Sequence, residues 1–137
     1  MTAKEYLMQA RDIDKRIESL IEHGERLREK LTAGRMAQIT GMPRGGRYDW
    51  ADAAVALIEL ERRNNQEIMD LCRLKHEIWD AIDAVEEAKY RWLLELRYMN
   101  CWTWERIADV MGYEVRQVHR IHGDALQKVR VPDGRCH

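Results

Sequence analysis

Four polar side chains crowd about one and a half turns of a predicted helix near the C-terminus: Arg116, Gln117, His119 and Arg120. Side chains of these types can donate hydrogen bonds to guanine and adenine edges, or to phosphate oxygens, in the major groove of DNA. The same residues would also make an ordinary solvated face, which is the default for polar residues opposite an apolar stripe. The elements around this helix decide between the two interpretations.

The upstream residues predict a second helix and a turn. Thr103 is a natural N-cap for a helix over 104–111, and Gly112 suits the left-handed conformation that ends a helix. The following helix begins near Glu114, and its apolar stripe repeats at steps of three and four, as Val115, Val118, Ile121, Ala125, Leu126 and Val129. A Thr-capped helix followed by a Gly-Tyr turn and a second helix is typical of a helix-turn-helix, which favours base contact for the polar face.

Residues 94–129 resemble the promoter-reading fourth region of bacterial sigma factors. The whole chain resembles the phage-encoded, sigma-like regulators of late transcription, the ArpU-like group. The matching segments are Leu96-Arg97-Tyr98, Thr103 to Ala108, Gly112-Tyr113 and Val118 to Val129. The resemblance implies that the helix carrying Val118 and Ile121 enters the major groove and that Arg116 and Arg120 meet bases. Two residues depart from the pattern: Glu114 stands where Ser or Thr is usual, and Val115 replaces a commonly basic residue.

Charge is distributed unevenly along the chain. Residues 1–87 carry 14 Lys and Arg against 18 Asp and Glu, whereas residues 88–137 carry 9 against 6. The basic end is the predicted helix-turn-helix, and three cations at its edges are expected to contact phosphates: Arg97, Lys128 and Arg130. A net charge of +3 is modest for a DNA-binding module, so we expect double-stranded DNA to be bound by more than one copy.

Composition predicts an all-α protein. The 137 residues are 45% hydrophobic and 34% charged, with two Pro and no Phe, which is typical of long, soluble helices. The longest apolar run, residues 53–58, is too short to span a membrane, and residues 1–5 lack the apolar core of a signal peptide. We therefore expect no membrane association and a location in the cytoplasm of a bacterial host.

The N-terminal half predicts a helical hairpin or coiled coil. From residue 4 to residue 31 the apolar stripe keeps a heptad period, interrupted by Gly24, which marks a bend or a close contact: Tyr6, Ala10, Ile13, Ile17, Leu20, Gly24, Leu27 and Leu31. A second helix is predicted from Trp50 to about Ala88, with its stripe at Leu57, Leu60, Ile68, Leu71, Ile78, Ile82 and Val85. Residues 62–65 form a polar break within it.

The glycine-rich segment 32–48 is expected to be a flexible loop joining the two long helices. The predicted organisation is a hairpin domain over 1–87, a helix-turn-helix domain over 88–131 and a tail over 132–137. Long apolar stripes need a long partner, so we expect the N-terminal helices to support a homo-oligomer. The pattern leaves open whether the hairpin closes within one chain or between two.

The remaining reactive residues do not form a recognisable site. Cys72, Cys101 and Cys136 are isolated thiols, which argues against a disulfide framework and a zinc ribbon, and we expect them to be reduced. His119 and His122 lie three residues apart and, with Cys136 and His137, would make only a weak metal site on the chain terminus. Phosphate-loop, metalloprotease and nucleophile motifs are absent from the sequence, so neither an enzyme nor a cofactor is expected.

Three functions fit these patterns. The favoured one is a sequence-specific transcription regulator that acts on promoter DNA, with RNA polymerase as a candidate partner. The second is a phage DNA-packaging subunit of the small-terminase kind, which also joins a helix-turn-helix to oligomerising helices. The third is an adaptor that binds RNA polymerase without contacting DNA.

Overall fold

The chain is all-α, as its composition predicts. A computed structural model describes residues 1–39 and 50–132, and these residues contain no strand. The helices are α1 (Ala3–Ile39), α2 (Trp50–Asp83), α3 (Ala88–Leu94), the π-helical turn η1 (Glu95–Met99), α4 (Trp104–Met111) and α5 (Val115–Lys128). No helix of the described segments combines the length and the apolar character needed to cross a membrane.

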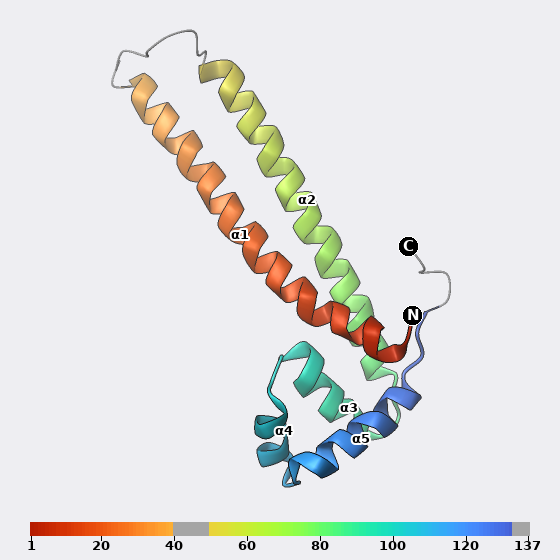
Figure 1. Cartoon of the computed structure of the whole chain (residues 1–137). Coiled ribbons are helices and arrows are strands. Elements are labelled where there is room, and N and C mark those ends of the chain that lie inside the picture. The colour runs from red at the N-terminus through yellow and green to blue at the C-terminus, as the bar shows by residue number, and fades with distance from the viewer. Residues whose placement is uncertain (40–49, 133–137) are drawn as a thin grey trace. The chain divides into compact units, whose positions relative to one another are not determined.

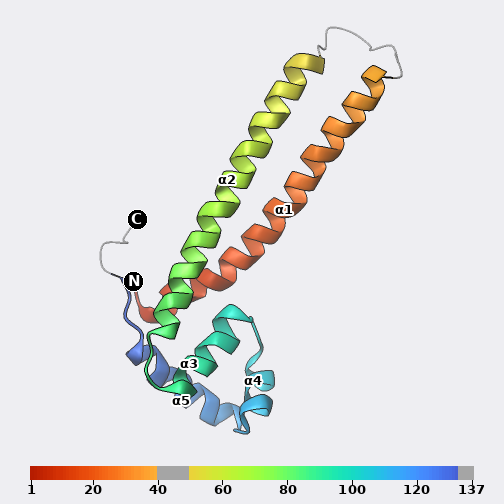
Figure 2. The same ribbon diagram turned by 180° about the vertical axis from the view of Figure 1, so that it is seen from behind.

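The two long helices form an antiparallel hairpin, which Figures 1 and 2 show from opposite sides. The chain divides into two compact units. One unit holds residues 15–71, which include most of α1 and most of α2. The other joins residues 1–14 to the chain from residue 72 onward, and it contains α3, η1, α4 and α5.

The predicted heptad stripe of α1 is confirmed, because every one of its members is buried or half-buried. The facing stripe of α2 in the 15–71 unit differs from the prediction at one residue. Leu60 is 46% exposed, and the inward positions repeat at steps of three and four as Ala54, Leu57, Glu61, Asn64, Ile68 and Leu71. The predicted polar break therefore contains a residue of the packed seam, Asn64, which is 5% exposed.

Asn64 is accommodated in the seam by a glycine on the opposite helix. Its Nδ2 donates to the Leu20 carbonyl at 2.9 Å, and a Cβ placed on Gly24 would lie 2.9 Å from the same nitrogen. Gly24 thus marks a close contact, one of the two roles expected for it. A single buried amide at a seam position can specify the register of paired helices, since any slip leaves it unbonded in an apolar environment.

We predict that Gly24 and Asn64 are energetically coupled. Replacing an interior helical Gly with Ala normally gains about 1 kcal/mol. In the wild-type chain, Gly24→Ala should not give this gain in the free energy of unfolding, because the new methyl group displaces the Asn64 amide. In an Asn64→Ala background, Gly24→Ala should give the full gain. Urea unfolding of the four chains of this double-mutant cycle gives the coupling, expected near 1 kcal/mol. Equal effects of Gly24→Ala in both backgrounds would contradict it.

The loop predicted for 32–48 is wrong in its first part, since residues 32–39 continue α1. Gly34, one of the glycines of that segment, lies instead on the inner face of the hairpin. A Cβ at Gly34 would meet the indole ring of Trp50, the first residue of α2, at 2.1 Å. Its missing side chain makes room for that ring. Residues 40–48 lie outside the described part of the chain.

In the other unit, the start of α1 and the end of α2 share a core with the short helices. Its fully buried side chains include Tyr6, Leu7, Ile78, Ile82, Leu93, Leu94, Ile107 and Val118. Asp14 connects three elements of this unit. One carboxylate oxygen is ion-paired with Lys75 of α2, and the other accepts from the Cys101 thiol, 3.5 Å away in the segment before α4.

Helix α2 ends at Asp83, earlier than the predicted boundary near Ala88. Val85 explains this ending. Its side chain is 2% exposed in the core, and its carbonyl accepts a hydrogen bond of 2.9 Å from Arg91 Nη1 of α3. These two contacts are made by backbone that has left the helix, and α3 then begins at Ala88.

Candidate nucleic-acid interface

Helix α4 begins and ends as its sequence predicts. The Thr103 hydroxyl accepts from the backbone N–H of Arg106 at 3.3 Å, which caps the first turn. Gly112 adopts φ 76° and its N–H bonds to the Ala108 carbonyl, which also accepts from Tyr113 N. A residue with a Cβ would be strained in that conformation, so Gly112 supplies the sharp turn out of α4.

Helix α5 begins after Glu114, which acts as the N-cap. The Glu114 side chain accepts from the backbone N–H of Gln117, and Gln117 Oε1 accepts from Glu114 N at 3.1 Å, so the two form a reciprocal capping box. Glu114 therefore performs the capping role that Ser or Thr has in the pattern it departs from. The predicted apolar stripe of α5 is confirmed, since all its residues are buried or half-buried.

Helices α4 and α5 pack against each other across a three-residue connection, residues 112–114. The small Ala108 is buried at this contact together with Ile107 of α4 and Val118 and Ile121 of α5. A small residue at a crossing lets two helices approach closely at an angle. This is the connectivity of a helix-turn-helix motif, with α5 in the position of the second helix.

The four predicted base-contacting residues are all exposed on α5, but they are not equivalent. Arg116 and Arg120 lie one turn apart on one face and make no hydrogen bond or ion pair with another described residue. Gln117 is engaged in the capping box through its carbonyl oxygen, which leaves its amide N–H groups available. The His119 ring lies against Trp104, with 4.6 Å between the ring centroids. Arg116 and Arg120 are therefore the two side chains best placed for an external ligand.

Two residues of the same face were not identified from the sequence. Gly123 and Gln127 follow Arg116 at seven and eleven residues, which places them on one line along the helix with Arg120. Both are exposed, and a Cβ built on Gly123 would meet no atom within 4 Å. Their helical spacing from Arg116 is the sequence signal that places them on this face. The surface at Gly123 is accordingly open to the close approach of another molecule.

Trp104 is the centre of an aromatic and cationic cluster in this unit. The Arg97 guanidinium lies 4.1 Å from the centroid of its ring, and the His119 and His122 rings lie 4.6 and 4.7 Å away. These contacts join η1, the first residue of α4 and two turns of α5. The cluster therefore fixes the orientation of α5 relative to the elements before it.

Arg97 makes contacts within its own unit, unlike a side chain that is free to bind phosphate. Its Nη1 donates to the Trp102 carbonyl at 2.9 Å, and burial lowers the pKa of its guanidinium, with repulsion from Arg11 adding to the effect. The π-helical turn η1 and the positive φ of Cys101, 59°, shape the backbone that brings this carbonyl to Arg97. The phosphate contact expected of Arg97 stays a prediction for its other N–H groups.

Tyr98 and His122 form a buried hydrogen bond within the cluster. Their Oη and Nε2 atoms are 2.7 Å apart. Burial raises the pKa of the Tyr98 phenol to about 12, so the hydroxyl keeps its proton at neutral pH. Burial lowers the pKa of His122 to about 4, and the positive charges of Lys4, Arg97 and His119 act in the same direction. At neutral pH the imidazole is therefore uncharged.

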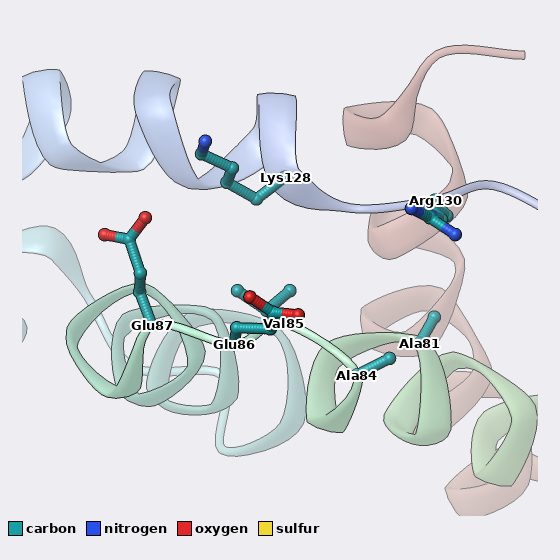
Figure 3. Close-up of a pocket in the computed structure, with 7 residues that line it drawn as sticks. All are labelled: Ala81, Ala84, Val85, Glu86, Glu87, Lys128 and Arg130. Atoms are coloured by element: carbon teal, nitrogen blue, oxygen red, sulfur yellow. The ribbon is translucent and has the colours of Figure 1, made fainter.

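Lys128 and Arg130, the other two predicted phosphate contacts, lie at the far end of α5 from Arg116. They line one side of a cavity of about 400 Å³ whose other side carries Glu86 and Glu87, and Glu87 projects toward the helix that bears Lys128 (Figure 3). None of the four makes an ion pair with another described residue. The two carboxylates offset the two cations locally, which weakens the attraction of this end for phosphate.

Two of the three predicted thiols, Cys72 and Cys101, lie in the described part of the chain. Cys72 and Cys101 are free, and burial raises the pKa of the Cys101 thiol, with the hydrogen bond to Asp14 adding to the effect. Nε2 of His122 is occupied by Tyr98. The described segments contain no group of three metal-binding side chains, and Cys136 and His137 lie outside them.

No protein-family model matches the chain, and neither does a curated protein or a solved structure.

Proposed function

We propose that the chain is a sequence-specific, double-stranded DNA-binding transcription regulator, a binding protein and not an enzyme, that acts in the cytoplasm of a bacterial host. One observation carries the proposal. Arg116 and Arg120 project, exposed and without partners among the described residues, from the second helix of a capped helix-turn-helix. An unpaired guanidinium on such a helix can bind guanine O6 and N7 through two hydrogen bonds.

The surrounding side chains take separate roles in this proposal. Arg116 and Arg120 read bases, and the Gln117 amide N–H groups supply a further polar contact. The His119 ring, which lies tilted against Trp104, contributes less to base reading and more to holding α5 in place. Lys128 and Arg130 attract phosphates without sequence preference. Self-association through the N-terminal helices brings two copies of α5 to paired half-sites, which compensates for the modest charge of one copy.

The test begins by selecting a target from random double-stranded DNA with the full chain. On the enriched duplex, Arg116→Ala and Arg120→Ala should each weaken binding by ~1–3 kcal/mol, whereas Lys128→Ala should weaken it equally on target and random DNA. The Lys128→Ala control should also reduce the slope of log affinity against log salt by about one unit. Circular dichroism should be unchanged in all three variants, because these side chains are exposed.

Unchanged affinity in both arginine variants would remove this face from the site. Failure to enrich any sequence, together with binding to RNA polymerase, would instead favour the adaptor function. One observation supports that second candidate: Trp92, 44% exposed, lines a shallow hollow of about 490 Å³ with Met111 and Tyr113. Exposed tryptophans are enriched among the residues that carry the energy of protein interfaces.

A further inference from the structure

The 15–71 unit carries apolar side chains that its own seam leaves uncovered. Ile21 of α1 is 45% exposed, and Val55, Ile58 and Met69 of α2 are 69%, 58% and 54% exposed. Each lies one residue after a seam position of its helix, so each is rotated about 100° from the seam in the same direction. We name these four residues the apolar flank.

An ion pair shows that the apolar flank lies on one side of the hairpin. Arg16 and Glu67 each come one residue before a seam position, and they meet across the helices at 2.9 Å. Residues one step before the seam on the two helices therefore share a side. Residues one step after the seam, including Ile21, Ile58 and Met69, share the opposite side. Leu60, which is also exposed, precedes Glu61 and lies on the side of the Arg16–Glu67 pair.

Three members of the apolar flank, Ile21, Ile58 and Met69, are nearly symmetric about one level of the hairpin. The hydrogen bond from Asn64 to Leu20 places Ile21 level with the region of residues 63–64. Ile58 and Met69 lie at almost equal distances on either side of that level. Between them, Arg62 and Asn65 occupy the two central positions of the same line. A rotation of 180° about an axis at this level exchanges the positions of Ile58 and Met69, so an interface with twofold symmetry can pair these two residues.

We propose that a second copy of this chain covers the apolar flank, with α2 packed antiparallel to α2 of the partner subunit. Ile58 then meets Met69 of the partner subunit, Met69 meets Ile58 of the partner subunit, and the two Ile21 side chains face each other near the twofold axis. The two hairpins together form an antiparallel four-helix bundle.

The interface is large enough for a stable dimer. Residues 50–71 rise about 33 Å, and two adjacent helices present a face about 20 Å wide, so packing buries roughly 1,300 Å² in total. Specific interfaces begin near ~1,200 Å². This interface is the surface for the self-association included in the proposed function, but dimer formation does not depend on DNA binding.

Cysteine cross-linking tests the pairing directly. The background is the full chain with Cys72→Ser and Cys136→Ser, and the test variant adds Ile58→Cys and Met69→Cys. Mild oxidation should convert most of this variant to a covalent dimer, because each new thiol meets its counterpart in the other copy. Ile58→Cys alone and Met69→Cys alone should stay monomeric on a non-reducing gel, since identical positions lie far apart along antiparallel helices. Leu60→Cys is the control on the opposite side and should also stay monomeric.

Light scattering tests the same interface without chemistry. The wild-type chain should be a dimer at micromolar concentration, Ile58→Asp should raise the dimer dissociation constant at least tenfold, and Leu60→Asp should leave it unchanged. A monomeric wild type, equal effects of the two aspartates, or more efficient cross-linking through Leu60→Cys would overturn the proposal. Arg116→Ala should remain dimeric. Loss of DNA binding in a dimeric chain therefore counts against the proposed function, and a monomer that binds its target counts against the interface.

Discussion

Trp104→Ala lowers the free energy of unfolding of the unit that contains α3, η1, α4 and α5 by about 3 kcal/mol. The loss has two physical sources. The ring is half-buried and its removal leaves a cavity, and it also provides the face on which Arg97, His119 and His122 rest. The half-buried Arg97 guanidinium would then lose its stacking partner while keeping its desolvation cost.

Urea unfolding followed by circular dichroism measures this effect in the full chain. Trp92→Ala is the matched control, because it removes the same side chain from an exposed position of the same unit, and it should cost less than about 1 kcal/mol. Trp104→Phe should retain part of the stability, since a smaller ring still covers part of the cluster. Equal losses in Trp104→Ala and Trp92→Ala would show that the cluster contributes nothing specific.

Lowering the pH from 7 to 5 decreases the stability of the same unit by about 2 kcal/mol through His122 alone. Burial holds the pKa of His122 at about 4 in the folded chain, against an ordinary value of 6.5. Between these two values the unfolded chain binds the proton and the folded chain does not. The stabilising difference is therefore complete above pH 6.5 and is lost as the pH falls toward 4.

His122→Gln isolates this effect from the titration of carboxylates. Glutamine keeps an oxygen that can accept from the Tyr98 hydroxyl but does not titrate, so the variant is less stable at pH 7 and loses less on acidification. Urea titrations of both chains at pH 7, 6 and 5 provide the comparison. Parallel pH profiles for wild type and His122→Gln would rule out the buried, neutral imidazole as the source.

The sequence predicts the helices and the polar face because their signals are local. Thr103 and Gly112 each act on backbone groups within a few residues, so their caps can be recognised from residue type and spacing. The heptad stripe of α1 is equally local, since it depends only on the repeat along one helix. The exposure of Arg116 and Arg120 follows from the opposite stripe of α5, which the sequence also displays.

Contacts between distant residues decided the rest. Gly34 lies in a segment with the composition of a loop, but its contact with the Trp50 ring makes it a packing position within α1. Asn64 belongs to the seam because Gly24 leaves room for its amide and the Leu20 carbonyl accepts its hydrogen bond. Val85 ends α2 because its carbonyl meets Arg91 of α3. No repeat along a single helix encodes such pairings.

The division of roles within the candidate site also required the tertiary structure. Sequence alone treats Gln117, His119 and Arg97 as free polar groups, whereas the fold engages Gln117 in a cap, rests His119 on Trp104 and bonds Arg97 to the Trp102 carbonyl. The type and spacing of residues determined which side chains α5 presents. Only three-dimensional packing decided which of them remain available to another molecule, because availability depends on neighbours from other elements.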